Sequence, residues 1–281
     1  MGGNQSSEIG NNQMRKEIFN RYNWIQSYSK FNEEIIKYNE EEEDEEKNYC
    51  DLRPNINGIF NENSNLIILS ICVYLNYLLL NTEKLNPFVI SYDYLDYNLS
   101  KLFNNDAGKN NFRSIFELIK KIGFVSADEN IFDRDKLRED IHELGKNYKY
   151  ILYKKVDNDI RLVKRLLNND KLILIGFPIY TNFESNINLT STLNVPKDND
   201  TIIGGISGII CGYIEKKEMF IMYVGISKKL GDRGYIYVPY DYIKRNSELW
   251  TLELNEELIL LNLNEKIKKS KVEDEENITF F

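Results

Sequence analysis

The spacing of apolar residues changes near the middle of this 281-residue chain. From Leu66 to Leu80 apolar residues follow one another with few interruptions, which predicts a buried helix in a mostly helical region over 50–150. After residue 150, short apolar runs alternate with turn-forming residues, which predicts a β region over 151–254. The predicted strands of this region are 150–156, 172–179, 202–214, 219–225 and 235–238.

The two ends of the chain have different patterns. Residues 1–13 are polar and are predicted to be disordered. Apolar residues then recur at three- and four-residue spacing, which predicts a helix over 14–38; these residues are Ile18, Tyr22, Ile25, Tyr28, Phe31, Ile35 and Tyr38. The unbroken acidic run 40–46 indicates a solvated linker over 39–49. The charged tail 255–281 is expected to be mobile, with room for a strand or short helix over Leu258 to Leu263.

Composition narrows the classes of function. A hydrophobic content of 42% is enough for a large core, and a net charge of -8 argues against a nucleic-acid partner. The chain has 3 Cys and 1 His without CxxC or HxxxH spacing, so we expect no metal and no cofactor. Cys72 and Cys211 lie in apolar runs and are expected to be buried free thiols, which favours a reducing, intracellular compartment. Neither a transmembrane run nor the apolar segment of a secretory signal is present.

The first residues, Met1-Gly2-Gly3-Asn4-Gln5-Ser6, fit the pattern for N-terminal myristoylation. This motif predicts myristate on Gly2 in a eukaryotic host, and a chance match on a polar tail is the alternative. One myristoyl chain binds membranes only marginally, with K on the order of 10⁴ M⁻¹. The net charge of -8 opposes an anionic leaflet, so we expect membrane association only with a second contact.

Several blocks of the chain, in order, resemble papain-like cysteine peptidases. They are Asp51-Leu52-Arg53-Pro54 with 59–63, 106–108 with 112–124, 160–168 with 172–183, Gly204 to Tyr213, 220–243, and Leu249 to Leu252. The resemblance implies an α+β, two-lobed fold over 50–254, with a central helix in the helical lobe and an antiparallel β lobe. Zymogens of this family carry an N-terminal helical segment over the cleft, and residues 14–38 would correspond to it. The bias toward Asn, Ile, Lys and Tyr is typical of AT-rich genomes, such as those of some large DNA viruses.

The resemblance also assigns the family's catalytic positions, and each carries another residue here. Ile68 stands at the nucleophile, Ile206 at the general-base histidine, Val224 at the orienting asparagine, and Glu62 at the oxyanion-hole glutamine. An ionised carboxylate would repel an oxyanion, and aliphatic side chains perform no acid–base chemistry. His142 lies in a polar stretch and is interpreted as a surface histidine. The chain is therefore expected not to be an enzyme.

One alternative remains open from the sequence. Ser70 or Cys72, close to the nucleophile position, would serve as the nucleophile of an active hydrolase if the register differs. No base is available to either, and a cysteine in an apolar helix is usually a small hydrophobe. The leading hypothesis is a binding or structural platform with a protein partner that the sequence does not name. We expect it to be cytoplasmic or membrane-associated in a eukaryotic host, with the virion as a further location.

Overall fold

The structure, a computed structural model, describes residues 23–27, 33–42, 47–56, 65–103, 111–129, 131–133, 136–181, 183–197, 199–227, 230–244 and 247–265. The predictions for residues 1–13, for Gly2 and for Glu62 lie outside the described residues.

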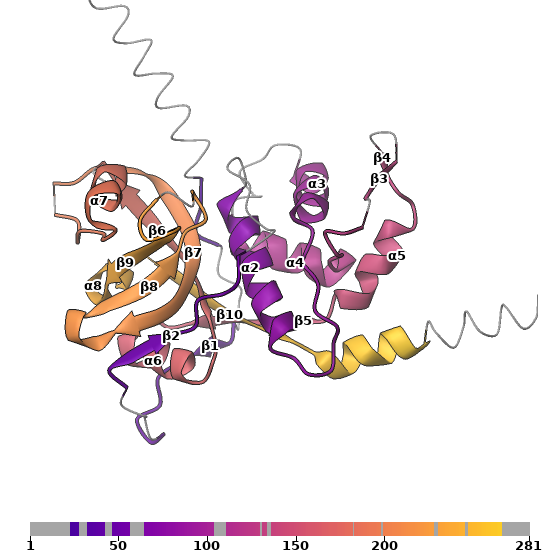
Figure 1. The fold of residues 1–281 in the computed structure, drawn as a ribbon, viewed down its shortest axis with the longest axis horizontal. Helices are drawn as coiled ribbons and strands as arrows, with labels where there is room; N and C mark the ends of the chain where they lie inside the picture. The colour runs from indigo at the N-terminus through magenta and orange to yellow at the C-terminus, as the bar shows by residue number, and fades with distance from the viewer. Residues whose placement is uncertain are drawn as a thin grey trace, which may run out of the picture.

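The helical lobe is built around α2 (Leu66–Leu80), which is buried along most of its length. The side chain of Asn65 caps this helix by accepting hydrogen bonds from the backbone of Ile67 and Ile68. The other helical elements of the lobe are α3 (Tyr92–Phe103), α4 (Phe112–Ile122), α5 (Ile141–Gly145) and the 3₁₀ turn η2 (Lys146–Tyr148). Among them, α3 packs against α2, α4 packs against α3, and α5 lies at the outer edge (Figure 1). The short strands β3 (Phe132–Asp133) and β4 (Lys136–Leu137) pair with each other.

The β lobe is a mixed sheet in the order β1-β5-β10-β6-β7-β8-β9, and β2 also pairs with β7. Its strands are β1 (Ile35–Ile36), β2 (Tyr49–Asp51), β5 (Ile151–Val156), β6 (Ile173–Tyr180), β7 (Ile202–Ile214), β8 (Met219–Tyr223), β9 (Tyr235–Pro239) and β10 (Glu248–Leu254). Between them lie α6 (Ile160–Asn168), α7 (Phe183–Thr190), η3 (Glu215–Lys217) and α8 (Tyr240–Ile243). All pairs are antiparallel except β1 with β5. The five strands predicted from the sequence are present, each within two residues of its predicted ends.

The first matched block, which begins at Asp51, meets the block 220–243 at one cluster. The Arg53 guanidinium lies 3.3 Å from Asp51 and 3.6 Å from Asp232, in the turn before β9. It also stacks on the Tyr235 ring at 5.0 Å, and the Tyr235 hydroxyl donates to the carbonyl of Pro54 at 3.1 Å. This cluster joins residues that are far apart in sequence, so both blocks contribute contacts that stabilise the fold.

The predicted helix over 14–38 is wrong in its described parts. Residues 23–27 and 33–38 are not helical, and Ile35–Ile36 form strand β1. Asn23 instead forms a parallel bridge with Gly205, and β1 pairs with Lys155–Val156 of β5. Backbone pairing with distant strands has overridden the local helical spacing of the apolar residues.

The described parts of the acidic run, residues 40–42, and of the C-terminal tail, residues 255–265, contact the rest of the domain. Glu42 pairs with Arg165 of α6 at 2.9 Å, and Glu40 lies 3.6 Å from Arg161 of the same helix. Residues 256–265 form a helix, one of the two alternatives predicted for Leu258 to Leu263, and Ile259 of this helix is fully buried. The folded unit thus extends beyond the predicted boundary at 254.

Candidate functional site

The start of α2 is apolar and closed to solvent. Ile68 is the third residue of the helix and is 0% exposed. A thiolate at this position would gain from the partial positive charge of the helix N-terminus, but an isoleucine has no titratable group. Its burial instead contributes about 1.5–3 kcal/mol to folding.

The two neighbouring candidates on α2 are also unsuited to nucleophilic chemistry. The Ser70 hydroxyl donates to the carbonyl of Leu66 at 2.7 Å, so its proton is committed to the helix backbone. Cys72 is 0% exposed, and burial raises the pKa of its thiol well above the usual range. A neutral, inaccessible thiol is neither a nucleophile nor a metal ligand.

Ile206 and Val224 lie on the β side of the same core. Ile206 is in β7 opposite Phe177 of β6 and is 0% exposed, while Val224 follows β8 and is 1% exposed. Ile68, Ile206 and Val224 all belong to one continuous cluster of buried apolar side chains; we call them the three aliphatic positions. Gly225 has a φ of +65°, and a Cβ there would lie 2.5 Å from Leu69 of α2. The loop after β8 therefore packs directly against the central helix.

The described part of the N-terminal segment, residues 23–27 and 33–36, lies across both lobes; we call it the strap. Its Trp24 lies on two glycines of the sheet, because a Cβ on Gly176 would be 2.1 Å from the indole and one on Gly205 would be 2.7 Å from it. The backbone N–H of Trp24 donates to the carbonyl of Gly205 at 3.1 Å. Any larger side chain at either glycine would collide with the ring. The fit leaves two polar atoms, Trp24 Nε1 and Ser207 Oγ, buried without a hydrogen-bond partner among the described residues.

Next to Trp24, the strap contacts a buried carboxylate. Glu248 of β10 is 1% exposed and pairs across the sheet with Gly176. Its two oxygens accept from the backbone N–H of Ser27 at 3.0 Å and from Trp250 Nε1 at 2.8 Å. Because a buried carboxylate oxygen without a hydrogen-bond donor would destabilise the fold, the Ser27 contact stabilises both the strap and strand β10 beneath it.

A buried ion pair fixes the other end of the strap. Glu33 pairs with Arg113 of α4, and the Arg113 side chain is 2% exposed. The guanidinium also stacks on the Trp250 ring at 5.0 Å, and Lys155 of β5 lies 4.0 Å from Glu33. The strap thus links α4 of the helical lobe with β5 and β10 of the sheet.

The chain's only histidine lies elsewhere. His142 is on α5, at the opposite side of the molecule from β7 (Figure 1). Its Nδ1 lies 3.0 Å from the Tyr94 hydroxyl, so it is a partly buried packing residue rather than the fully solvated one expected. Burial, with help from Lys146 and Lys101, lowers the pKa of the imidazole.

The cysteine side chains of the described residues are closed to solvent. Cys50, Cys72 and Cys211 are buried and unpaired, as predicted for the last two, and burial raises the pKa of each thiol. Within the described ranges, no group of three His, Cys, Asp or Glu side chains could hold a metal ion. None of the described helices is long and apolar enough to span a membrane.

Comparison with known proteins agrees with this architecture. The sequence is 27% identical over 187 residues to an uncharacterized peptidase C1-like protein of Acanthamoeba polyphaga mimivirus. The match covers 60% of each chain. The chain thus has a C1-like relative in sequence and papain-like neighbours in structure. No protein-family model matches it.

The fold is papain-like, as predicted. Xylellain, a cysteine protease from Xylella fastidiosa, superposes with a TM-score of 0.71 at 20% identity, over 83% of this chain and 96% of xylellain. Procathepsin B S9 from Trypanosoma congolense gives a TM-score of 0.62 at 12% identity, over 85% and 88% of the two chains. Procathepsin L 3 from Tenebrio molitor gives 0.58 at 11% identity, over 86% and 79%.

Sequence reasoning missed the residues that hold the strap. Glu248 and Arg113 were not singled out, because a lone charged residue beside an apolar run has no distinctive spacing. Trp24 lay within the predicted helix 14–38, and nothing in that pattern indicated that its ring would cover the sheet. The available signal was the pair of glycines at 176 and 205 within predicted strands, which indicates a close approach by another group.

Proposed function

We propose that this papain-like protein is catalytically inactive and acts as a binding or structural platform. The observation that carries the proposal is the burial of Ile68, Ile206 and Val224 in one apolar core, where the family resemblance expects a thiol, an imidazole and an amide. Cysteine-peptidase chemistry needs the thiol and the imidazole within hydrogen-bond reach of each other. Three aliphatic side chains provide neither a nucleophile nor a base.

Two further observations support inactivity. The only imidazole of the chain, on α5, contacts Tyr94 rather than any cysteine. The sheet surface at Gly176 and Gly205 is also covered by Trp24 of the same chain. A peptide substrate would have to displace the strap before reaching that surface.

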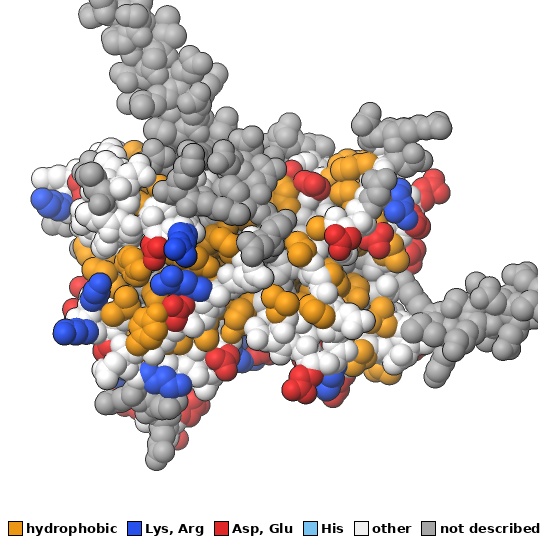
Figure 2. Space-filling model, in the orientation of Figure 1, with side chains coloured by type: hydrophobic (Ala, Val, Ile, Leu, Met, Phe, Trp, Pro, Cys, Tyr) orange, Lys and Arg blue, Asp and Glu red, His pale blue; other side chains and the backbone are white. Residues whose placement is uncertain are grey.

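The mixed surface is compatible with a platform. On the face in Figure 2, lysine and arginine side chains lie mostly over the β lobe, acidic side chains lie mostly over the helical lobe, and apolar side chains reach the surface of both. Such a surface offers both charged and apolar contacts to a protein partner. The proposal therefore includes a protein partner and a cytoplasmic or membrane-associated location in a eukaryotic host.

The test of inactivity uses the full chain with a thiol-directed covalent probe and a mixed peptide library. We expect no labelling and no hydrolysis in the folded state, with labelling of the cysteines only after denaturation, since all three are buried. An active papain-like peptidase is the positive control. Peptide turnover that disappears in Cys72→Ala or Ser70→Ala would contradict the proposal and support the hydrolase alternative.

We extend the proposal to a lipid anchor on Gly2, motivated by the Met-Gly-Gly-Asn-Gln-Ser start and the viral relative. Association with membranes or virions would then depend on myristate plus a second contact. Intact mass of the protein made in eukaryotic cells measures the modification directly. Flotation with Gly2→Ala measures its consequence, and an unmodified or merely acetylated N-terminus would remove the anchor from the proposal.

A further inference from the structure

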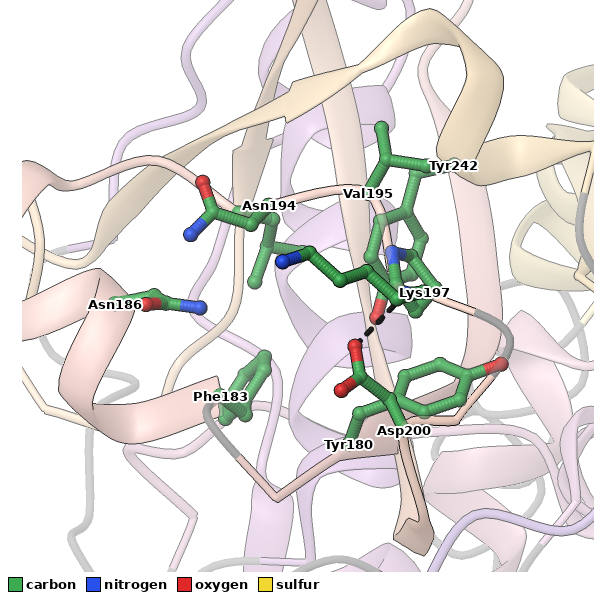
Figure 3. Close-up of a pocket in the computed structure, with 10 residues that line it drawn as sticks. Tyr180, Phe183, Asn186, Asn194, Val195, Lys197, Asp200 and Tyr242 are labelled. Atoms are coloured by element: carbon green, nitrogen blue, oxygen red, sulfur yellow. Dashed lines mark hydrogen bonds between the residues drawn. The ribbon is translucent and has the colours of Figure 1, made fainter.

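A separate cavity of about 180 Å³ lies in the β lobe, between α7, residues 193–197, Asp200 and the ends of β6 and α8 (Figure 3). None of its lining residues is one of the three aliphatic positions or belongs to the strap. Ligand pockets for drug-sized molecules are typically about 300–1,000 Å³, so an occupant of this cavity must be small.

Aromatic rings make the walls of the cavity. Phe183 of α7 is 3% exposed, and Tyr180 and Tyr242 meet edge to face with ring centroids 6.5 Å apart. The Tyr242 hydroxyl donates to the carbonyl of Pro178 at 3.2 Å, which fixes that ring on the sheet. Leu193, which is 2% exposed, adds an aliphatic surface. These walls suit an apolar or aromatic side group.

A tight turn brings opposite charges to the rim of the cavity. The backbone N–H of Lys197 donates to Asp200 Oδ2 at 2.8 Å, and the N–H of Asp200 donates back to the carbonyl of Lys197 at 3.0 Å. Both side chains line the cavity as a result (Figure 3). Among the described residues the Lys197 ammonium has no ion-pair partner, and Asp200 Oδ1 accepts no hydrogen bond. In Figure 3 the Asn186 amide points toward the same space.

We propose that this pocket binds a free α-amino acid with an apolar or aromatic side chain. The ligand carboxylate would contact the Lys197 ammonium and the Asn186 amide, its ammonium would contact Asp200, and its side chain would lie between the rings. Only a small zwitterion uses both charges of the rim, because a simple anion would face the Asp200 carboxylate and a simple cation would face Lys197. Since the rim is open to solvent, we expect a dissociation constant on the order of 1 mM.

The experiment titrates the full-length protein with L-phenylalanine and follows ligand-observed NMR together with chemical shifts of α7. Two analogues separate the charges: 3-phenylpropionate lacks the ammonium, and phenethylamine lacks the carboxylate. We expect L-phenylalanine to bind at least about tenfold more tightly than either, because each analogue loses one charge-assisted contact and leaves one rim charge unpaired.

Two variants remove one charge each and keep the turn. Lys197→Met leaves the backbone donor in place, and Asp200→Asn retains an oxygen to accept it, so both should fold. Each should weaken binding of L-phenylalanine by about tenfold. The matched control is Lys216→Met, an exposed lysine on η3, which should bind as the unchanged protein does. Absence of binding at tens of millimolar, equal binding of the three ligands, or an equal loss in the control would each overturn the assignment.

Discussion

The three aliphatic positions are fully enclosed, whereas the strap is only partly buried, and the two regions are held in place in different ways. Ile68, Ile206 and Val224 exclude solvent through apolar contacts that are part of the core itself. The strap is held by hydrogen bonds and an ion pair that involve Glu248 and Arg113. The first arrangement tolerates changes of shape poorly, and the second depends on each polar atom keeping its partner.

This difference has a functional consequence. The aliphatic side chains of the core make no hydrogen bonds or ion pairs. A competing segment therefore cannot replace their contacts by offering equivalent polar partners. The strap has such polar contacts, and two buried polar atoms, Trp24 Nε1 of the strap and Ser207 Oγ of β7, have no hydrogen-bond partner among the described residues. The strap is therefore the region of the two that a competing segment could replace, provided that the segment supplied a carboxylate to Arg113 and a donor to Glu248.

The largest expected effect comes from breaking the buried ion pair of the strap. Glu33→Ala leaves the Arg113 guanidinium without its carboxylate at a side chain that is 2% exposed. We expect a loss of about 3–5 kcal/mol in the free energy of unfolding, measured by chemical denaturation. The neighbouring Glu34, whose side chain is 73% exposed in its pair with Lys154, is the matched control and should lose no more than about 1 kcal/mol. Equal losses in the two variants would mean that the strap is not energetically coupled to α4.

The apolar region should respond to truncation with a comparable but smaller effect. Ile206→Ala removes buried methyl and methylene groups and leaves a cavity, which should cost about 2–4 kcal/mol of unfolding free energy. Ile202 starts the same strand but is 54% exposed, so Ile202→Ala should change stability by only about 0.5 kcal/mol. A similar loss in both would contradict the burial of Ile206.

The third prediction tests whether the strap opens locally while the core stays closed. Trp24→Ala removes the ring from Gly176 and Gly205, so the Ser27 N–H bound to Glu248 should open more often. Hydrogen exchange of Ser27 should accelerate by about tenfold or more, while the amides of α2 should keep their protection. Ile25, which is 47% exposed, provides the control variant Ile25→Ala. Faster exchange throughout α2 would show that the strap and the core open as one unit.

The smallest expected effect is a pH dependence that belongs to neither region. Burial lowers the pKa of His142 in the folded state, so the unfolded chain binds the proton more tightly. Stability from the neutral imidazole is therefore present above the unfolded pKa of about 6.5 and is lost as the pH falls through the folded value. Thermal unfolding at several pH values should show a shallower decline below that pKa for His142→Gln than for the unchanged chain. Identical slopes would contradict the partial burial of the ring.

The sequence alone was enough for the central helix and for five strands of the β lobe, but not for β1, β2 or β10. Runs such as 172–179 and 202–214 are apolar because both faces of β6 and β7 are covered, and this property is local and readable. The ordered blocks also pointed to the papain-like fold, which the structural neighbours confirm. The identity of residues 68, 206 and 224 was equally plain from the sequence, and the structure added their burial.

Tertiary structure alone decided the conformation of the strap and the grouping of its partners. The spacing from Ile18 to Tyr38 favours a helix, yet Trp24 pairs with Gly205 and Ile35–Ile36 pair with β5, more than a hundred residues away. The position of Lys197 and Asp200 beside α7 likewise depends on the turn that their backbones form. The aromatic rings beside this turn come from β6 and α8, which are distant in sequence. Periodicity records how a segment would bury its own apolar face, whereas the conformation adopted depends on which distant backbone and side-chain groups are available to bind it.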